Sequence, residues 1–244
     1  MKIIADTHTH SIACSHAYST ISENIHAARE AGMLYLAMTE HGPKMPDAPF
    51  YWHFTNQHEV PDFYDGVHVL HGVEADVLGP DGSLDLDNKL LASLDWVIAS
   101  MHIPCFTPGT VEDHTNAWLA VAENPHVDVI GHCGDLRYRF DYERVIKVFK
   151  ETGKIVEINN NSAYVRPGAK ENCIEIARLC KKWEVPVVVN SDAHFCTKVG
   201  KFETALAMLD GLNFPERLVV NADPDRFALL AESKRGNHSN HANQ

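Results

Sequence analysis

The stretch Asp6-Thr7-His8-Thr9-His10 follows the apolar run Ile3-Ile4-Ala5, so it lies where a first short β-strand is expected to end. Alternate side chains of an extended chain point to the same face, so His8 and His10 would project together toward one point. Two imidazoles on one face form a metal-ligand geometry. Two surface histidines near the amino terminus would show the same pattern, because short motifs often match by chance. The rest of the chain has to decide between these interpretations.

Short apolar segments alternate with helical patterns along the whole chain. Strands are expected at residues 3–5, 34–38, 67–74, 94–100, 127–131, 154–159 and 186–190. Helices are expected at residues 22–31, 111–122, 142–152, 170–183 and 202–209, followed by a short extended piece at 217–220 and a helix opened by Asp223-Pro224. This alternation is typical of parallel strands with crossover helices, and about seven strands favour a closed α/β barrel over an open sheet.

Two segments do not fit this alternation. Residues 43–65 form a long connection rich in Pro, His and aromatic residues. Such a connection is expected to be either a functional lid or a locally packed surface loop. The polar, Asn-rich end at residues 234–244 is expected to be disordered, which leaves residues 1–233 as a single domain.

Composition and charge exclude several classes of protein. A hydrophobic content of 45% is that of a globular protein with a large core. Without an apolar run of ~20 residues or a signal-peptide pattern, the expected location is the cytoplasm, with no membrane partner. The net charge of −12 argues against an extended nucleic-acid partner. Bound divalent cations would still allow a small anionic substrate. Six cysteines without CxxC spacing are expected to be reduced thiols.

Histidine and carboxylate side chains gather at the carboxyl ends of the expected strands. They are His8, His10, His41, Glu74, His102, His132, Asp192 and His194, and His16 in the loop after the first strand can join them. In a barrel these ends meet on one face, where barrel enzymes build their sites. Chance placement would scatter the 16 histidines over helices and strand beginnings as well. The set therefore predicts a metal site on a rigid scaffold.

Nine ligands are too many for one ion, since catalytic zinc usually keeps about three protein ligands and one open position. Seven imidazoles and two carboxylates would serve three ions. Imidazole-rich ligation favours Zn, with Mn or Fe as alternatives, over Mg or Ca. Clustered divalent ions lower the pKa of a bound water to give hydroxide, hold a phosphoryl group and stabilise a leaving oxygen.

As a set, these motifs resemble the PHP-domain (polymerase and histidinol phosphatase) metallohydrolases. The matching segments are Asp6-Thr7-His8-Thr9-His10, Thr39-Glu40-His41-Gly42, Glu74, His102, Gly131-His132 and Ser191-Asp192-Ala193-His194. Residues 15–20, 52–54, 157–160 and 200–203 further resemble the YcdX-type phosphatases. The resemblance spans the chain to about Ser233. Cys133 and Asp135 stand where Pro and Asn are expected, which puts the shape and charge of this loop in doubt.

The resemblance implies a distorted (βα)7 barrel, similar to a TIM barrel, with three zinc ions in a deep cleft and a homo-oligomer, with a trimer as one form. By matching position, the first ion is expected to be bound by His8, His10, Glu74 and Asp192. The second ion is expected to be bound by Glu74, His102 and His132, with Glu74 bridging the first and second ions. The third is expected to be bound by His16, His41 and His194.

The expected activity is that of a metal-dependent phosphoesterase acting on small phosphate monoesters, with a metal-bound hydroxide as the nucleophile. Glu74, Asp192 and His194 are the candidate catalytic residues. Arg166 and Arg137 are candidates for binding the substrate phosphate, although an exposed salt bridge is the alternative favoured for Arg137.

Asp6 and the nearby cysteines are secondary candidates. Asp6 is expected either to orient His8 or His10 or to cap a turn. Cysteines close to the ligands are expected to be packing groups, with oxidant sensitivity as the alternative. They are Cys14, Cys105, Cys133 and Cys196.

Three alternative functions remain. A histidinol-phosphate phosphatase or a nuclease (phosphodiesterase) would keep the chemistry and change the substrate, although the acidic composition weighs against long nucleic acid. A metal-storage or metal-sensing protein would bind ions without turnover. Purely structural zinc would be expected in closed, sulfur-rich sites, which this histidine-rich set is not.

Overall fold

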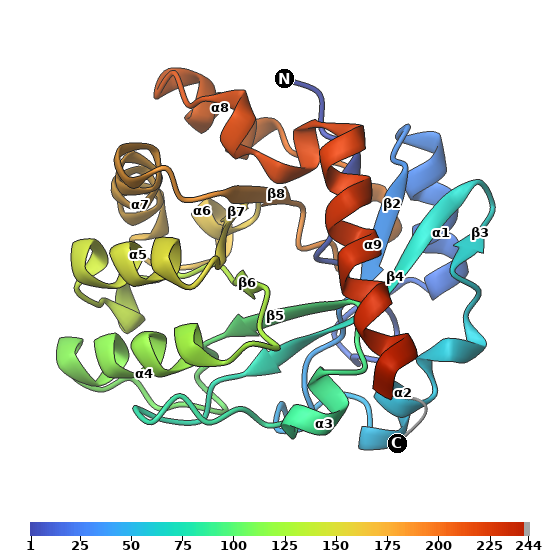
Figure 1. The fold of residues 1–244 in the computed structure, drawn as a ribbon, viewed down its shortest axis with the longest axis horizontal. Coiled ribbons are helices and arrows are strands. Elements are labelled where there is room, and N and C mark those ends of the chain that lie inside the picture. The colour runs from blue at the N-terminus through green and yellow to red at the C-terminus, as the bar shows by residue number, and fades with distance from the viewer. Residues whose placement is uncertain (242–244) are drawn as a thin grey trace.

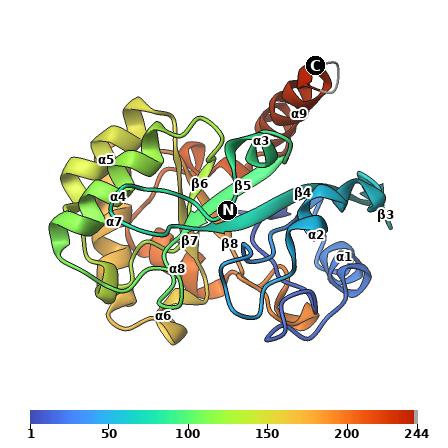
Figure 2. The same cartoon turned by 90° about the horizontal axis from the view of Figure 1, so that it is seen from below.

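The computed structural model describes residues 1–241, with side chains as far as Lys234. Seven parallel strands pair in the order β1-β2-β4-β5-β6-β7-β8, and the short β3 pairs antiparallel with β4. The sheet curves into a nearly closed barrel (Figures 1 and 2), as predicted for a distorted (βα)7 fold. The strands are β1 (Ala5–Asp6), β2 (Tyr35–Met38), β3 (Phe63–Tyr64), β4 (Val67–Asp76), β5 (Trp96–Ser100), β6 (Val129–Ile130), β7 (Ile155–Asn159) and β8 (Val187–Asn190).

Helices cover the outside of the barrel, and α4, α5 and α7 lie side by side along one flank (Figure 1). Thr20 and Thr110 form capping boxes at the starts of α1 and α4. Caps of this kind stabilise a helix by about 1 kcal/mol. The helices are α1 (Ile21–Glu30), α2 (Tyr51–Thr55), α3 (Asn88–Leu91), α4 (Val111–Glu123), α5 (Tyr142–Glu151), α6 (Ser162–Val165), α7 (Ala169–Trp183), α8 (Glu203–Gly211) and α9 (Pro224–His241).

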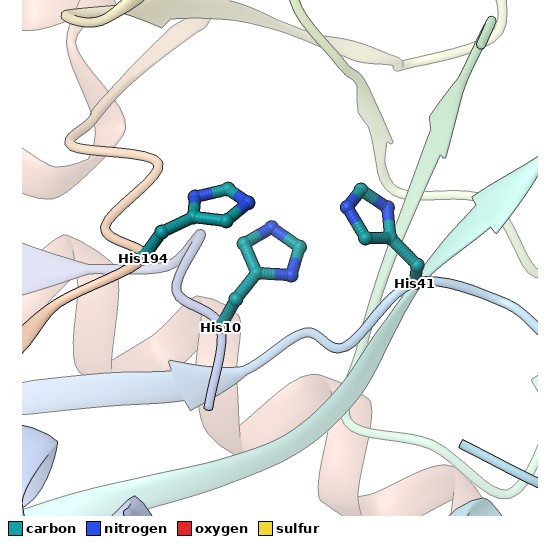
Figure 3. Close-up of side chains that lie close together, drawn as sticks. All are labelled: His10, His41 and His194. Carbon is teal, nitrogen blue, oxygen red and sulfur yellow. The ribbon is translucent and has the colours of Figure 1, made fainter. Parts of the chain in front are cut away.

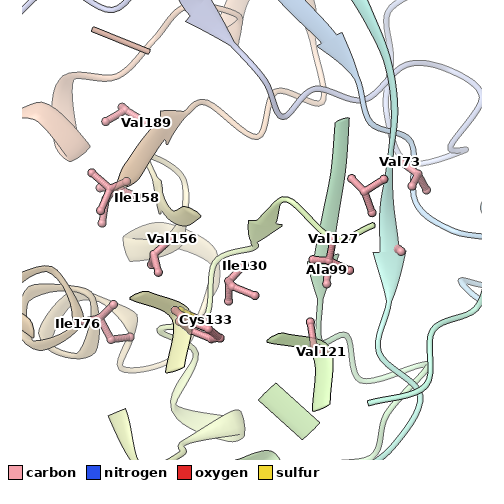
Figure 4. Packing of buried hydrophobic residues seen from close by; sticks show 14 of the residues in the cluster. Val73, Ala99, Val121, Val127, Ile130, Cys133, Val156, Ile158, Ile176 and Val189 are labelled. Atoms are coloured by element: carbon pink, nitrogen blue, oxygen red, sulfur yellow. The ribbon is translucent and has the colours of Figure 1, made fainter. Parts of the chain in front are cut away.

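The two faces of each strand bury different neighbours. In β7, Val156 and Ile158 point outward into the large cluster between sheet and helices, which Figure 4 shows from close by. The inward-facing series starts with the apolar Ile155 and continues with Glu157 and Asn159. The barrel interior is thus apolar at the amino ends of the strands and polar at their carboxyl ends, which is why the polar site lies there.

Residues 217–220, expected to be extended, instead form parts of two 3-10 turns, Glu216–Leu218 and Val220–Ala222. The turns lie between β8 and the start of the chain, where Val219 makes a single parallel bridge to Val187. The Asn221 side chain donates to the Ala5 and Val189 carbonyls and accepts the Val189 N–H. An amide side chain therefore supplies hydrogen bonds that a strand would otherwise make, so the segment needs no extended conformation.

The last helix closes the amino-terminal end of the barrel. Phe227 and Ala231 of α9 pack in the interior cluster, with Phe227 against Trp96. The backbone of α9 stays helical to His241, within the segment where disorder is expected, so the expected boundary at residue 234 does not coincide with the end of the helix. Lys234 pairs with the buried Asp128, which attaches α9 to the barrel. The remaining tail, residues 242–244, lies outside the described residues.

The long connection at residues 43–65 lies at the surface and contains α2, a 3-10 turn and β3, with a few side chains that attach it to the core. Phe54 is buried in the core, and the Gln57 side-chain amide donates to the Gly72 carbonyl. Near its start, the connection reaches the predicted site, where Asp47 contacts His16. Within the described residues, every helix is too short or too polar to cross a lipid bilayer.

Candidate metal centre

All nine predicted ligands converge at the carboxyl ends of the strands. His10, His41 and His194 come from the loops after β1, β2 and β8, and their rings lie close together (Figure 3). The ring centroid of His10 lies 4.4 Å from that of His41 and 4.4 Å from that of His194. His16, whose side chain is 43% exposed, places its Nε2 atom 2.9 Å from Nε2 of His194. Among these four imidazoles, those of His16 and His194 reach solvent, whereas His10 and His41 are buried beneath them.

Glu74, on the inner face of β4, lies at the centre. Its Oε2 atom is 2.8 Å from Nδ1 of His41 and 3.3 Å from Nε2 of His8. Its Oε1 atom is 2.7 Å from Nε2 of His132 and 3.5 Å from Nε2 of His102. Each carboxylate oxygen therefore faces its own group of imidazoles, which is the geometry of a ligand shared between two cations.

One carboxylate oxygen of Asp192 faces the cluster of ligands, and the other accepts hydrogen bonds from neighbouring side chains. Its Oδ1 atom lies 3.7 Å from Nε2 of His8 and 3.5 Å from Nε2 of His10. Its Oδ2 atom accepts hydrogen bonds from Arg166 Nη2 at 3.1 Å and from Asn159 Nδ2 at 3.1 Å. Arg166 is therefore held next to a predicted ligand, with its side chain only 11% exposed.

The buried atoms of the cluster fit metal ions. Within residues 1–234, His8 Nε2 and both ring nitrogens of His10 are buried without a hydrogen-bond partner, and His41 Nδ1 and Glu74 Oε2 face each other at 2.8 Å without a well-aligned hydrogen bond. An unsatisfied buried polar atom costs about 1–3 kcal/mol, so several in one place are not expected without a ligand. The chain also brings groups of three ligand atoms within 4.8 Å of one another. They are His8/His10/Asp192, His8/Glu74/His132, His41/Glu74/His102 and His10/His41/His194.

The surrounding charges keep the two carboxylates of the cluster ionised, and they shift its imidazoles in both directions. Against the effect of burial, Glu157 and Glu74 raise the pKa of His8 well above its ordinary value, and Glu74 raises the pKa of His41. Burial would raise the pKa of Glu74, but His8, His102 and His41 hold this pKa well below its ordinary value. Burial likewise opposes ionisation of Asp192, yet His8 and Arg166 keep its pKa well below the usual range. Burial lowers the pKa of His102 to about 4, so this imidazole is neutral at physiological pH. Carboxylates and neutral imidazoles are the forms that bind metals, so binding would release protons from His8 and His41.

Three carboxylates that were not predicted as part of the site orient the histidines. Glu157 Oε1 lies 2.6 Å from Nδ1 of His8, and Asp76 Oδ1 lies 2.6 Å from Nδ1 of His102. Asp47 contacts Nδ1 of His16 in the same way. Each contact fixes one ring nitrogen, leaves the other for a metal and makes the imidazole more basic.

Glu157→Gln is expected to lower metal affinity and kcat/KM by about 10- to 100-fold, because the amide no longer supports the ring orientation and basicity of His8. Glu157 also accepts the His132 N–H at 2.8 Å, so two ligands would lose support. Titration of the metal-free protein with zinc and steady-state kinetics would measure the loss. Glu151→Gln on the exposed surface of α5 is the control. Equal zinc affinities of Glu157→Gln and Glu151→Gln would contradict the expectation.

Asp6, a secondary candidate, and Arg137, a candidate for phosphate binding, both make local contacts. Asp6 accepts the backbone N–H groups of Ser191 at 3.1 Å and Gly200 at 2.9 Å, which confirms the turn-capping alternative and not the orienting one. Arg137 pairs with Asp135, and its side chain is 38% exposed. Asp135 is one of the two departures from the family pattern, and its contact with Arg137 matches the salt-bridge alternative.

All six cysteines, which lie within the described residues, are free thiols. Cys14 is buried, and its sulfur accepts the His41 N–H at 3.4 Å. It also lies near His10 and Glu40 in an arrangement that could hold a metal. Burial and the Glu40 charge raise the pKa of Cys14, which opposes the thiolate form that metals require. We therefore interpret Cys14 as a packing group that supports the His41 loop.

Two ligands have unusual backbone conformations. Asp192 has φ of 56° and His132 has φ of 21°, both in a region that non-glycine residues seldom adopt. The preceding Gly131 is tightly packed, since a Cβ atom there would lie 2.1 Å from Ser100 Oγ. Backbone strain of this kind costs about 1–3 kcal/mol and concentrates at functional sites. Its location at two predicted ligands supports a role in positioning them.

Sequence comparisons agree with this geometry. The PHP domain family model matches residues 6–161, and the PHP-associated model matches residues 171–211. A probable phosphatase from Clostridium novyi is 44% identical over 235 residues, which cover 96% of this chain and 96% of the relative. One from Acetivibrio thermocellus is 43% identical over 235 residues, which cover 96% of this chain and 98% of the relative.

A comparison of folds finds a histidinol phosphate phosphatase from Lactococcus lactis, solved with zinc, L-histidinol and phosphate. It superimposes with a TM-score of 0.60, covering 88% of this chain and 95% of its own. At 15% sequence identity, this likeness concerns the fold.

Proposed function

The chain belongs to the PHP domain family and is a phosphoesterase, and from this premise we propose that it hydrolyses small phosphate monoesters at a centre of three zinc ions. The observation that carries the proposal is the position of Glu74. It is fully buried, and its two oxygens face separate groups of imidazoles. A carboxylate in this position can join neighbouring cations into one multinuclear centre.

The nine ligands divide into three sets in the proposed centre. The first ion would be held by His8, His10, Glu74 and Asp192. The second would share Glu74 with the first and would also be held by His102 and His132. His16, His41 and His194 would hold the third. When bound, such ions act as Lewis acids, lower the pKa of a bound water and neutralise phosphoryl oxygens. The imidazole-rich set favours zinc over Mg or Ca, and the trimer implied by the family resemblance stays a prediction.

The chain itself supplies phosphate binding and positioning. Arg166 donates a hydrogen bond from Nη2 to Asp192 Oδ2 at 3.1 Å and another from Nη1 to Ser162 Oγ at 3.4 Å. An arginine has five N–H donors, so others remain for the phosphoryl oxygens. Glu74 and Asp192 hold the site in place from its buried side, while His194, with 27% of its side chain exposed, lies where a substrate can reach it.

The test is hydrolysis by the zinc-loaded protein of a panel of phosphate esters, followed as phosphate release from p-nitrophenyl phosphate and histidinol phosphate, as phenol release from a bis-aryl phosphodiester and as strand cleavage of RNA. We expect steady turnover of monoesters and little cleavage of the other two. Zinc binding without turnover would support a storage or sensing protein. Faster cleavage of the diester or RNA would support the nuclease alternative, and a strong preference for histidinol phosphate would identify that activity instead.

Arg166→Met in the same assay is expected to lower kcat/KM by about 10- to 100-fold, since hydrogen bonds to a charged group contribute roughly 1.5–3 kcal/mol. Arg137→Met should have less than about a threefold effect, because the Arg137 side chain is engaged by Asp135 and an exposed ion pair contributes little. Equal losses in the two variants would mean that Arg137 also binds the phosphate.

A further inference from the structure

A cavity of about 770 Å³ opens beside the metal centre. Two predicted ligands, Asp192 and His194, form part of its wall, and the remaining walls come from the loops after β1, β7 and β8, from α6 and from the start of α8. A phosphate monoester whose phosphoryl group lies at the metal centre would extend its alcohol part into this space. The volume is in the usual range for a site that binds a small organic molecule.

Three aromatic side chains from three different segments line this cavity. Tyr18, Tyr164 and Phe195 are 72%, 74% and 46% exposed. The Tyr18 N–H donates to the His194 carbonyl at 2.8 Å, and the Tyr164 hydroxyl lies 3.0 Å from Thr204 Oγ1. Phe195 directly follows His194. Large apolar side chains left exposed around one cavity indicate a binding site, and aromatic faces stack on planar rings.

Two lysines line the same cavity. Lys198 and Lys201 are exposed, and neither forms an ion pair with any residue whose side chain the structure describes. One carboxylate, Glu203, also lines the cavity and can offset one of the two charges. The charge on Asp192 is already engaged by Arg166. The phosphoryl group itself would be neutralised at the metal centre, so the lysines are available for a second anionic group.

We propose that this cavity selects phosphate monoesters whose alcohol part carries a planar ring and a second anionic group, such as a carboxylate. The proposal rests on the proposed phosphatase function and names its substrate class. The ring would lie among the three aromatic side chains, and the second anion would contact Lys198 and Lys201. In a chain with a net charge of −12, two exposed lysines beside the site provide local attraction for such an anion.

The test uses the zinc-loaded full chain and three synthetic esters with similar leaving groups. Benzyl phosphate carries a planar ring, cyclohexylmethyl phosphate carries a saturated ring of similar size, and 4-carboxybenzyl phosphate adds the second anion. We expect kcat/KM to be about tenfold higher for the benzyl than for the cyclohexylmethyl ester, through stacking. The carboxybenzyl ester should gain about fivefold more, and this gain should shrink as ionic strength rises, because the lysines are exposed.

Two variants separate the two contributions. The double substitution Lys198→Met with Lys201→Met should remove the preference for the carboxylated ester. Tyr164→Leu with Phe195→Leu should reduce the preference for the planar ring. The controls are Lys89→Met on α3 and Trp52→Leu on α2, which are exposed residues of the same types that do not line the cavity. The controls should leave both ratios of kcat/KM unchanged.

The outcomes distinguish this inference from the proposed function. Equal kcat/KM for the three esters, or a carboxylate preference that survives the double lysine substitution, would overturn the inference while leaving the phosphatase activity in place. Phosphate release from none of the esters or from the wider panel would instead overturn the proposed function. Both preferences, each lost only in its own variant, would support the inference.

Discussion

Glu74→Gln is expected to lower kcat/KM by about 10³-fold or more and to reduce the zinc content by two of the three proposed ions. The substitution keeps the size of the side chain and removes its charge, so the shared ligand of two cations loses most of its affinity. Metal ions supply several kcal/mol of transition-state stabilisation, and each 1.36 kcal/mol is a factor of ten in rate. Phosphate release and metal analysis of the purified variant would measure both losses.

His41→Ala provides the comparison that tests the division of ligands. His41 is proposed to hold only the third ion, so this variant should be inactive but should keep two ions. Asp128→Asn is the control for the loss of a buried carboxylate, because Asp128 precedes β6 at the opposite end of the barrel and accepts the Val97 N–H at 2.9 Å. Equal zinc contents in Glu74→Gln and His41→Ala would contradict the bridging role of Glu74.

Much of this fold can be predicted from the sequence because the barrel depends on local patterns. Short apolar runs and amphipathic segments alternate, and a helical crossover between consecutive strands leads to parallel pairing. The ligands follow from the same pattern, since every strand end must face one side of the barrel. To predict the ligands, it is therefore enough to know where each strand ends, and the register between the strands is not needed.

The supporting residues depend on contacts that sequence patterns do not record. Asp76 is the easier case, since it lies two residues after Glu74 and so shares its face of β4. Asp47 had no such signal, because it reaches His16 from the long connection. Asn221 was missed because a side-chain amide takes over hydrogen bonds between β1 and β8, a role set by the space between them. These contacts join residues distant in sequence, and only the folded chain reveals them.

Removing the metal ions is expected to lower the melting temperature by about 10 °C or more. Without cations, the buried Glu74 and Asp192 lose compensating positive charge, and the buried ring nitrogens of His8 and His10 lose their expected ligand. One site filled at 1,000 times its Kd stabilises the folded state by about 4 kcal/mol. Each kcal/mol shifts the Tm of a domain of this size by roughly 2–4 °C, and further sites would add to this effect.

Thermal unfolding before and after treatment with a strong chelator would measure this shift, with metal analysis to confirm that the ions are gone. Adding zinc back should restore the Tm, whereas magnesium should not, because imidazole-rich sites disfavour it. Glu74→Gln should show a smaller shift on chelation, since it starts with fewer ions. A metal-free protein with an unchanged Tm would mean that the nine side chains are compatible without cations. The buried atoms without hydrogen bonds would then no longer support a metal centre.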